Sequence, residues 1–293
     1  MKQLQIDGRT TLCGLFGYPV EHSFSPAMHN AAFRALNLNW AYVPFRVEPG
    51  HLPRAVEAVR CLNLAGVNVT VPHKEAVLPY LDELTPAAKT IGAVNVILNN
   101  NGKLTGYNTD GRGFTRALRE EAGFIPKAKK AVILGAGGAA KAVAVQLALE
   151  GAAEIVIINR TVNRGEGLAQ TLAQMGAVSR VLTWEQRDQA ADAAAAADLV
   201  VQATNVGMYP ETNQCLPIPE EVFNSHQVVC DLIYNPVETK FLKLAGARGV
   251  TVVSGLGMLL YQGVLAFELW TKTAAPVEVM KRALNNQLGG RKG

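Results

Sequence analysis

Apolar residues along this chain form short runs that end at glycine or proline, and stretches with helical spacing lie between these runs. Residues 99–102, Asn-Asn-Asn-Gly, predict a hairpin between two strands. The elements predicted in the first third are strands at 11–17, 41–47, 66–72, 93–98 and 103–108, and helices at 25–36, 52–62 and from 109 onward. Strands that alternate with helices in this way predict an α/β domain.

From residue 130 the pattern becomes a regular succession of strand and helix. Helical segments, such as the alanine-rich stretch at 189–197, separate most of the strands. The strands are predicted at 131–134, 155–158, 180–183, 199–203, 228–232 and 251–253. This succession is typical of a doubly wound parallel sheet.

The end of the chain is helical, at residues 258–271 and 276–287, and has no strand of its own to cover. We therefore expect these helices to pack on the first α/β domain. That packing predicts a discontinuous first domain of residues 1–111 and 256–293. The doubly wound domain, residues 112–255, is then inserted into it.

A glycine cluster follows the first strand of the inserted domain, and a helical pattern begins directly after it. Strand, Gly-x-Gly-x-x-Ala and helix in this order are typical of a turn that binds a dinucleotide. Gly135 permits the tight turn, Gly137 leaves the backbone open to a pyrophosphate, and Ala140 lets the helix approach the strand. The helix start offers unpaired N–H groups and a positive dipole end. The cofactor-binding residues predicted here are Gly135, Ala136, Gly137, Gly138 and Ala139, the alternative being a purely structural turn.

The end of the next strand indicates which dinucleotide binds. A site for NAD usually has Asp or Glu here, whereas this strand ends in Asn159-Arg160-Thr161, with Arg164 one turn later. Two guanidinium groups and a hydroxyl suit a 2′-phosphate, so the sequence favours NADP over NAD. The alternative is that Arg160 and Arg164 are solvated surface residues, although cations at a helix start are unfavourable without an anion.

Composition narrows the class of protein further. The chain has 293 residues, is 49% hydrophobic, and carries a net charge of +4 without a basic run, which suits two cores and an anionic ligand but no nucleic acid. It shows no signal-peptide core and no apolar run near the ~20 residues of a membrane helix, so we expect no membrane partner and a cytoplasmic protein.

Cysteines and histidines give no sign of a metal. The four cysteines form no CxxC pair and lie mostly in apolar runs, which favours buried free thiols over disulfides or metal ligands. His22, His29 and His73 match no metal-ligand spacing. We therefore expect no metal site.

Hydride transfer needs a group that donates or accepts a proton. Lys74 follows an apolar strand, where a lysine could be partly desolvated, and Asp110 lies at a predicted helix start. From spacing alone, Lys74 is equally well a surface lysine, and Asp110 fits a helix cap better than a catalyst. Ser25 also fits a cap, because Pro26 suits the first helical position.

Taken together, these motifs resemble the shikimate dehydrogenase family over nearly the whole chain. The segments that resemble its substrate-site signatures, in its order, are Ser23-Phe24-Ser25-Pro26, Asn68-Val69-Thr70-Val71-Pro72-His73-Lys74, Gly92-Ala93-Val94-Asn95 and Asn108-Thr109-Asp110-Gly111. Its NADP signatures and closing segment are similar to Gly135-Ala136-Gly137-Gly138-Ala139, Asn159-Arg160-Thr161 and Gly255-Leu256-Gly257-Met258-Leu259, followed by Gln262. One departure is Gln202, where the family commonly has Asn before a Thr-x-x-Gly-Met stretch.

The resemblance implies reversible NADPH-dependent reduction of 3-dehydroshikimate to shikimate, an oxidoreductase step of aromatic amino-acid (chorismate) biosynthesis. It implies that Lys74 is the acid–base that protonates the forming alkoxide, while Asp110 bonds the adjacent hydroxyl and orients the amine. The other substrate-binding residues that it implies are Ser23, Ser25, Thr70, Asn95, Tyr234 and Gln262. The residues that it implies at the nicotinamide end are Thr204, Met208, Leu232 and Gly255.

Two alternatives stay open at this point. One is a quinate/shikimate dehydrogenase with broader substrate or NAD use, and the other is a non-catalytic NADP-binding regulatory module. The expected partner is the small-molecule substrate, and a homodimer is an open alternative to a monomer. Gly111 and Gly255 lie near the expected domain crossings, and we hypothesise that they are hinges.

Overall fold

The structure, a computed structural model, describes residues 6–289 and divides the chain into two compact units. The first unit comprises Met1–Thr109 and Gln262–Gly293, and the second is Asp110–Tyr261. The sequence places the two crossings after residues 111 and 255 instead. Helix α10 (Gly255–Thr271) therefore begins in the second unit and ends in the first.

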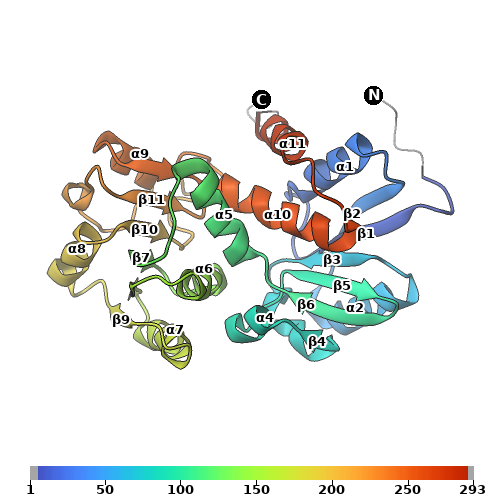
Figure 1. Cartoon of the computed structure of the whole chain (residues 1–293), viewed down its shortest axis with the longest axis horizontal. Helices are drawn as coiled ribbons and strands as arrows, with labels where there is room; N and C mark the ends of the chain where they lie inside the picture. The colour runs from blue at the N-terminus through green and yellow to red at the C-terminus, as the bar shows by residue number, and fades with distance from the viewer. Residues whose placement is uncertain (1–5, 290–293) are drawn as a thin grey trace. The chain divides into compact units, whose positions relative to one another are not determined.

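A mixed sheet of six strands forms the centre of the first unit, in the order β2-β1-β3-β5-β6-β4. Three parallel strands make up one half, β1 (Thr11–Gly17), β2 (Trp40–Arg46) and β3 (Gly66–Val69). In the other half β5 (Val96–Asn100) runs antiparallel to β3 and to β6 (Lys103–Tyr107). The arrangement of this sheet is drawn in Figure 1.

The predicted hairpin joins β5 to β6, and positive φ angles of 53° and 90° at Asn101 and Gly102 make its tight turn. The sequence pattern did not show β4 (Glu83–Leu84), which pairs parallel with β6. Two residues are too few to display an alternation of apolar and polar positions, so this strand exists only through its pairing.

Helices cover both faces of the first sheet. On β2, Phe45 contributes to the core under α2 (Leu52–Cys61), and Tyr42 points to the opposite face. On that opposite face α1 (Ser25–Ala35) packs against α11 (Val277–Gly289) and the end of α10. Trp270 of α10 donates its indole N–H to the Ile97 carbonyl oxygen at 3.0 Å. The closing helices thus belong to the core of the first unit. The short helices α3 (His73–Ala76) and α4 (Pro86–Ile91) follow β3 and β4.

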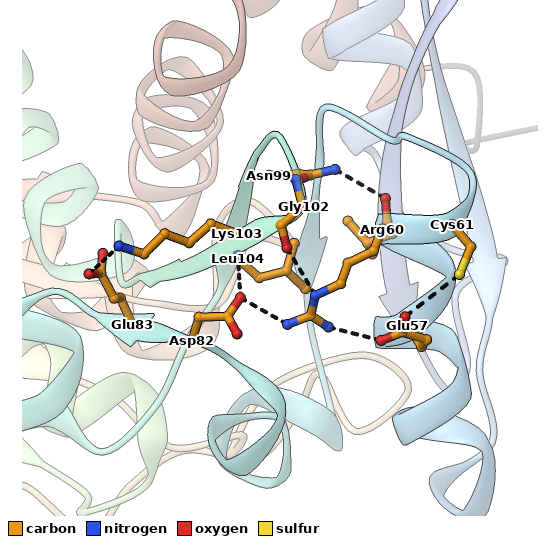
Figure 2. A network of polar contacts seen from close by, with 10 residues as sticks. Glu57, Arg60, Cys61, Asp82, Glu83, Asn99, Gly102, Lys103 and Leu104 are labelled. Carbon is orange, nitrogen blue, oxygen red and sulfur yellow. Dashed lines mark hydrogen bonds and ion pairs between the residues drawn. The ribbon is translucent and has the colours of Figure 1, made fainter.

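A polar clamp attaches the β5–β6 hairpin to α2, as Figure 2 shows. The Arg60 guanidinium donates to the Gly102 carbonyl oxygen at 3.0 Å and pairs with Asp82 at 2.9 Å and with Glu57 at 3.1 Å. Asp82 also accepts the Leu104 N–H at 2.7 Å, and these bonds hold the pKa of its carboxyl below its usual value. One arginine therefore connects a helix, a hairpin turn and the segment before β4.

The second unit is built on a sheet of six parallel strands, in the order β12-β11-β10-β7-β8-β9. Counted from its own first strand, this is the 3-2-1-4-5-6 order of a dinucleotide-binding fold, so the predicted doubly wound sheet is confirmed. The strands are β7 (Lys130–Leu134), β8 (Glu154–Ile158), β9 (Ser179–Leu182), β10 (Leu199–Gln202), β11 (Val228–Asp231) and β12 (Thr251–Val253).

Helices cover both faces of this sheet (Figure 1). One face packs on α5 (Asp110–Ala122), α6 (Gly138–Leu149) and α7 (Val162–Gln174). The other face packs on α8 (Arg187–Ala195) and α9 (Lys240–Ala247). Successive residues of each strand belong alternately to the hydrophobic cores on the two faces, because side chains along a strand alternate between its faces.

Local details differ from the sequence expectations. Ser25 is the first residue of α1 rather than its cap, since Phe24 holds the cap position and the Ser25 N–H donates to the Ser23 hydroxyl at 3.3 Å. The strand expected at 66–72 ends at Val69, because the chain turns there and the His73 N–H donates to the Thr70 carbonyl oxygen. The helix expected from residue 258 begins three residues earlier, at Gly255.

All four cysteines are free thiols, and Cys13 and Cys230 are buried as expected. Cys61 at the end of α2 is exposed, so the expectation of burial is wrong for this residue. Within residues 6–289, none of the helices combines the length and apolar character needed to span a bilayer.

Candidate functional site

The glycine turn lies at the carboxyl end of β7, where β8 is the neighbour on one side and β10 on the other. Gly135 has a φ of +118°, and a Cβ there would lie 3.0 Å from Cγ2 of Thr204 and 3.1 Å from the Ala203 carbonyl oxygen. Its N–H donates to the Ile158 carbonyl oxygen at 2.8 Å. Both the conformation and the close approach therefore require glycine at this position.

Helix α6 begins at Gly138 directly after the turn, and its cap residue Gly137 offers no side chain. A Cβ added at Gly137 or Gly138 would meet nothing within 4 Å, so the backbone here borders open space. The first N–H groups of the helix have no side-chain cap, and Ala140 is fully buried against the sheet. An open, uncapped helix start of this kind fits a pyrophosphate.

The loop after β8 lies beside this turn, through the bond from Gly135 to Ile158. The Asn159 amide donates to the Thr161 carbonyl oxygen at 2.8 Å, which shapes the start of α7. Thr161 is the cap residue of α7, yet its hydroxyl makes no cap bond. Arg160 and Arg164 are exposed, and neither forms an ion pair within the described part of the chain. Exposed guanidinium groups are suited to a 2′-phosphate, and the assignment of Arg160 and Arg164 to it stays a prediction.

The four residues predicted at the nicotinamide end follow β10, β11 and β12, whose carboxyl ends meet at one edge of the parallel sheet. Thr204 lies directly against the glycine turn, because a Cβ added at Gly135 would be 3.0 Å from its Cγ2 atom. A Cβ added at Gly255 would lie 2.3 Å from the Leu232 carbonyl oxygen, so these two residues also touch. Met208 is 44% exposed. The structure therefore brings Thr204, Leu232 and Gly255 to the same edge as the glycine turn.

Behind these residues lies a buried polar pair, Gln202 at the end of β10 and Asp231 at the end of β11. Asp231 accepts the Thr239 hydroxyl at 2.6 Å and the Ile233 N–H at 2.9 Å. Burial raises the pKa of Asp231 to about 6, while hydrogen bonds from Thr239, Ile233 and Gln202 oppose this rise.

In the first unit, buried polar side chains connect β2, β3 and the segment before β5. The Tyr42 hydroxyl, which lies near the predicted residue Ser25, donates to Oδ1 of Asn68 at 2.8 Å. The Asn68 amide then donates to the Asn95 carbonyl oxygen at 3.1 Å. Tyr42 is fully buried, and burial raises the pKa of its hydroxyl well above the usual value. Asn68 thus joins Tyr42 to the predicted substrate residue Asn95.

The Asn95 side chain is held at both ends. Its Oδ1 accepts the Thr109 N–H at 2.7 Å, and its Nδ2 lies 2.9 Å from Oγ1 of Thr109 and 3.4 Å from Oε1 of Gln262. Thr109 Oγ1 also lies 3.2 Å from the Gln262 carbonyl oxygen. Since all three residues are less than a tenth exposed, the amide orientation of Asn95 is fixed by its neighbours.

Backbone bonds bring Thr70 and Lys74 to the same region of the first unit. The Val94 N–H donates to the Lys74 carbonyl oxygen at 2.8 Å, one residue before Asn95. The Val69 N–H donates to the Asn95 carbonyl oxygen at 2.9 Å, one residue before Thr70. Lys74 lies on α3 and is half-buried.

Two predicted site residues belong to the second unit. Asp110 is the first residue of α5 and is 6% exposed, and Tyr234 follows β11 and is 37% exposed. A Cβ added at Gly111 would lie 2.4 Å from the Ala142 carbonyl oxygen in α6. Close packing of two helices therefore accounts for glycine at position 111.

Sequence reasoning did not single out Tyr42, Asn68, Thr109 or Asp231. Asn68 and Thr109 lie inside the quoted motifs, and Asp231 directly follows three apolar strand residues, which is a usable signal for a buried acid. Tyr42 has no such signal. Among residues 6–289, no three His, Cys, Asp or Glu side chains come together in a way that could hold a metal ion.

Comparison with known families places matches along most of the chain. The model of the shikimate dehydrogenase substrate-binding domain matches residues 15–97. The shikimate/quinate 5-dehydrogenase model matches residues 120–252, and the model of the shikimate 5′-dehydrogenase C-terminal domain matches residues 255–284.

Individual relatives extend over the full chain. The NADP⁺-dependent shikimate dehydrogenase of Desulforamulus reducens is 56% identical over 288 residues, which cover 98% of this chain and 99% of that protein. A crystal structure of a shikimate dehydrogenase in complex with NADP⁺ has a TM-score of 0.90 at 43% identity, covering 97% of this chain and 98% of the other. The shikimate 5-dehydrogenase of Listeria monocytogenes, in complex with shikimate and NAD, has a TM-score of 0.92 at 39% identity, covering 97% and 99%.

Proposed function

This chain belongs to the shikimate dehydrogenase family, and we propose that it interconverts 3-dehydroshikimate and shikimate in aromatic amino-acid biosynthesis, with Lys74 and Asp110 handling the proton. It is an oxidoreductase that acts on a CH–OH group, and its cofactor is NADP. The observation that carries the activity is the identity of 56% maintained over 98% of the chain.

NADP binds at the carboxyl edge of the second sheet in this proposal. Residues 135–139 and the start of α6 hold the pyrophosphate, because that backbone is open and uncapped. Asn159, Arg160, Thr161 and Arg164 hold the 2′-phosphate. Thr204, Met208, Leu232 and Gly255 contact the nicotinamide end. The bound cofactor supplies or removes the hydride.

Substrate binding rests on short neutral side chains. Ser23 and Ser25 bind the carboxylate, and Thr70, Asn95, Gln262 and Tyr234 bind the carboxylate or the ring hydroxyls. The hydrogen bonds from Tyr42 to Asn68, and from the Thr109 N–H to Asn95, support these roles because they hold the amides in one orientation. Fixed neutral donors and acceptors discriminate a small polyhydroxy acid well, since a wrong ligand leaves them unpaired.

Lys74 protonates the alkoxide that forms during reduction and removes the same proton in the reverse direction. Asp110 bonds the adjacent hydroxyl and orients the amine. The position of Lys74 supports its role, because its backbone is bonded to the segment that carries Asn95.

The test of this assignment is Lys74→Ala. A general acid–base contributes roughly 10²–10⁴ in rate, so kcat should fall by about that factor while the affinity for NADP stays at its wild-type value. Lys89→Ala is the matched control, since Lys89 is an exposed lysine on α4 of the same unit and its loss should change neither quantity. Near-native turnover by Lys74→Ala would show that the acid–base is another group. A non-catalytic NADP-binding module predicts instead that the wild-type chain binds NADP without turnover and that Lys74→Ala leaves this binding intact.

A second activity to compare is that of a quinate/shikimate dehydrogenase, because the family model for residues 120–252 spans both names. Steady-state rates with shikimate plus NADP against quinate plus NAD separate the two. Faster turnover of quinate plus NAD would contradict our proposal. A cytoplasmic location and a homodimer stay predictions, to be checked by cell fractionation and sedimentation.

A further inference from the structure

A buried carboxylate connects the two loops that carry the nicotinamide contacts in the second unit. Gln202 and Asp231 are register partners at the ends of β10 and β11, and their exposed fractions are 0% and 1%. The loop of residues 203–209 follows Gln202 and contains Thr204 and Met208. The loop of residues 232–236 follows Asp231 and begins with Leu232.

Two donors converge on the Asp231 carboxylate. The Ile233 N–H donates to Oδ1 at 2.9 Å, and the Thr239 hydroxyl donates to Oδ2 at 2.6 Å. The Thr239 oxygen also accepts the Leu242 N–H at 3.3 Å, so its one proton points to Asp231. This pattern of donors requires an acceptor at both carboxylate oxygens.

The Gln202 side chain forms two hydrogen bonds with the backbone of the loop of residues 203–209. Its Oε1 accepts the Thr204 N–H at 2.5 Å, and its Nε2 donates to the Val206 carbonyl oxygen at 3.0 Å. Because one end of the amide must accept and the other must donate, the side chain has a single orientation. An Asn side chain is one methylene shorter and would not reach both ends of the loop from the same backbone position.

The two loops are also bonded to each other, since the Tyr209 N–H donates to the Asn235 carbonyl oxygen at 3.1 Å. We propose that Asp231 and Gln202 are positioning residues that hold residues 203–209 and 232–236 in the arrangement that receives the nicotinamide half of NADP. This inference rests on the proposed NADP-binding edge of the second sheet. It assigns both side chains to the nicotinamide end and not to the adenosine end.

Two ligands test this division. NADP⁺ occupies both ends of the site, whereas adenosine 2′,5′-bisphosphate lacks the nicotinamide half and needs only the 2′-phosphate and adenosine contacts. The variant Asp231→Asn replaces one carboxylate oxygen by an NH₂ group, which cannot accept a hydrogen bond. Either the Ile233 N–H or the Thr239 hydroxyl then loses its bond to a charged acceptor. We expect the dissociation constant of NADP⁺, measured by calorimetry, to rise by roughly tenfold or more, while that of adenosine 2′,5′-bisphosphate is unchanged.

Asp198→Asn is the matched control. Asp198 accepts the Lys130 N–H at 2.9 Å and pairs with Lys129, at the start of β7 and therefore at the other edge of the same sheet. The same substitution there should leave the affinity for both ligands unchanged.

Gln202→Asn is the second variant, and it keeps the test decisive if Asp231→Asn does not fold. It keeps an amide and should again weaken NADP⁺ alone. Equal losses for both ligands, or no loss for either, would overturn the proposal. The comparison needs no turnover, so a wild-type chain inactive on shikimate would refute the proposed function without deciding this one. Unchanged affinities beside normal wild-type turnover would refute only the positioning role.

Discussion

His29 should make the first unit less stable in acid. Its ring is fully buried, stacks on Tyr42 with centroids 4.5 Å apart and an interplanar angle of 8°, and lies 5.4 Å from the Trp270 ring. In the part of the chain that the structure describes, neither ring nitrogen has a hydrogen-bond partner. Burial without a partner lowers the pKa of His29 from 6.5 to about 3. The folded chain therefore keeps this histidine neutral.

The sign of the effect follows from where the proton binds. Below pH 6.5 His29 becomes protonated in the unfolded chain but stays neutral in the folded chain. The stability that depends on the neutral ring is therefore complete above pH 6.5 and is lost as the pH falls toward about 3. One pKa unit corresponds to about 1.4 kcal/mol. Lowering the pH from 7.5 to 4.5 should therefore reduce the free energy of unfolding by about 3 kcal/mol through His29 alone.

The perturbation is His29→Leu, which has no group to titrate. Urea unfolding at pH 7.5 and pH 4.5 gives the free energy of unfolding of each protein. A Trp184→Phe background restricts the fluorescence signal to the first unit, which contains Trp40 and Trp270. Relative to wild type, the variant should gain about 3 kcal/mol at the lower pH. Every other titrating group is common to both proteins and cancels in the difference.

His51→Leu is the control, because His51 is an exposed histidine of the same unit. Its stability difference from wild type should not move with pH by a comparable amount. The same pH dependence in wild type and His29→Leu would refute the reasoning. An imidazole signal, assigned to His29 by its loss in the variant, that titrates in NMR spectra between pH 8 and pH 5 would refute it as well.

Two further predictions concern charged side chains. Replacing Arg160 and Arg164 by Ala should raise the KM for NADP by roughly tenfold or more and leave the KM for NAD unchanged, because only the 2′-phosphate loses bonds to a charged group; equal changes for both cofactors in steady-state assays would contradict this. Arg60→Met should lower the free energy of unfolding of the first unit by about 1–3 kcal/mol in urea, because Arg60 is three-quarters buried and bonds three elements (Figure 2). The control Lys103→Met should lower it by less than about 1 kcal/mol, because the ion pair of Lys103 with Glu83 is half exposed.

Most of the fold was predictable because its elements carry local patterns. The strand at 251–253 and the strand at 11–17 agree with the sequence residue for residue, since each is an apolar run with a clear stop. The hairpin at 99–102 was predictable from one Asn-Gly pair. The strand order of the second sheet is that of the doubly wound fold, which the regular alternation of strand and helix predicts.

The polar framework of the site was less predictable. The bond between Tyr42 and Asn68 spans 26 residues, and the contact between Asn95 and Gln262 spans 167. Such pairs leave no periodic trace, because each partner is chosen by the tertiary structure and not by its neighbours in the chain. The same reason accounts for Ser25, whose sequence fits a helix cap although the structure makes it the first residue of α1 and places Phe24 at the cap.

Gly111 and Gly255 can be interpreted either as hinges or as positions where close packing excludes a side chain. Their places near the domain crossings suggest hinges, but each is pressed against backbone, Gly111 against Ala142 and Gly255 against Leu232. A side chain at either position would have to displace a backbone carbonyl group, so close packing is enough to explain both glycines. Gly111 fixes the start of α5, and hence Asp110, on the helix that follows the glycine turn. Asp110 is therefore positioned by the nucleotide-binding unit, whereas Lys74 is positioned by the unit that contains Asn95.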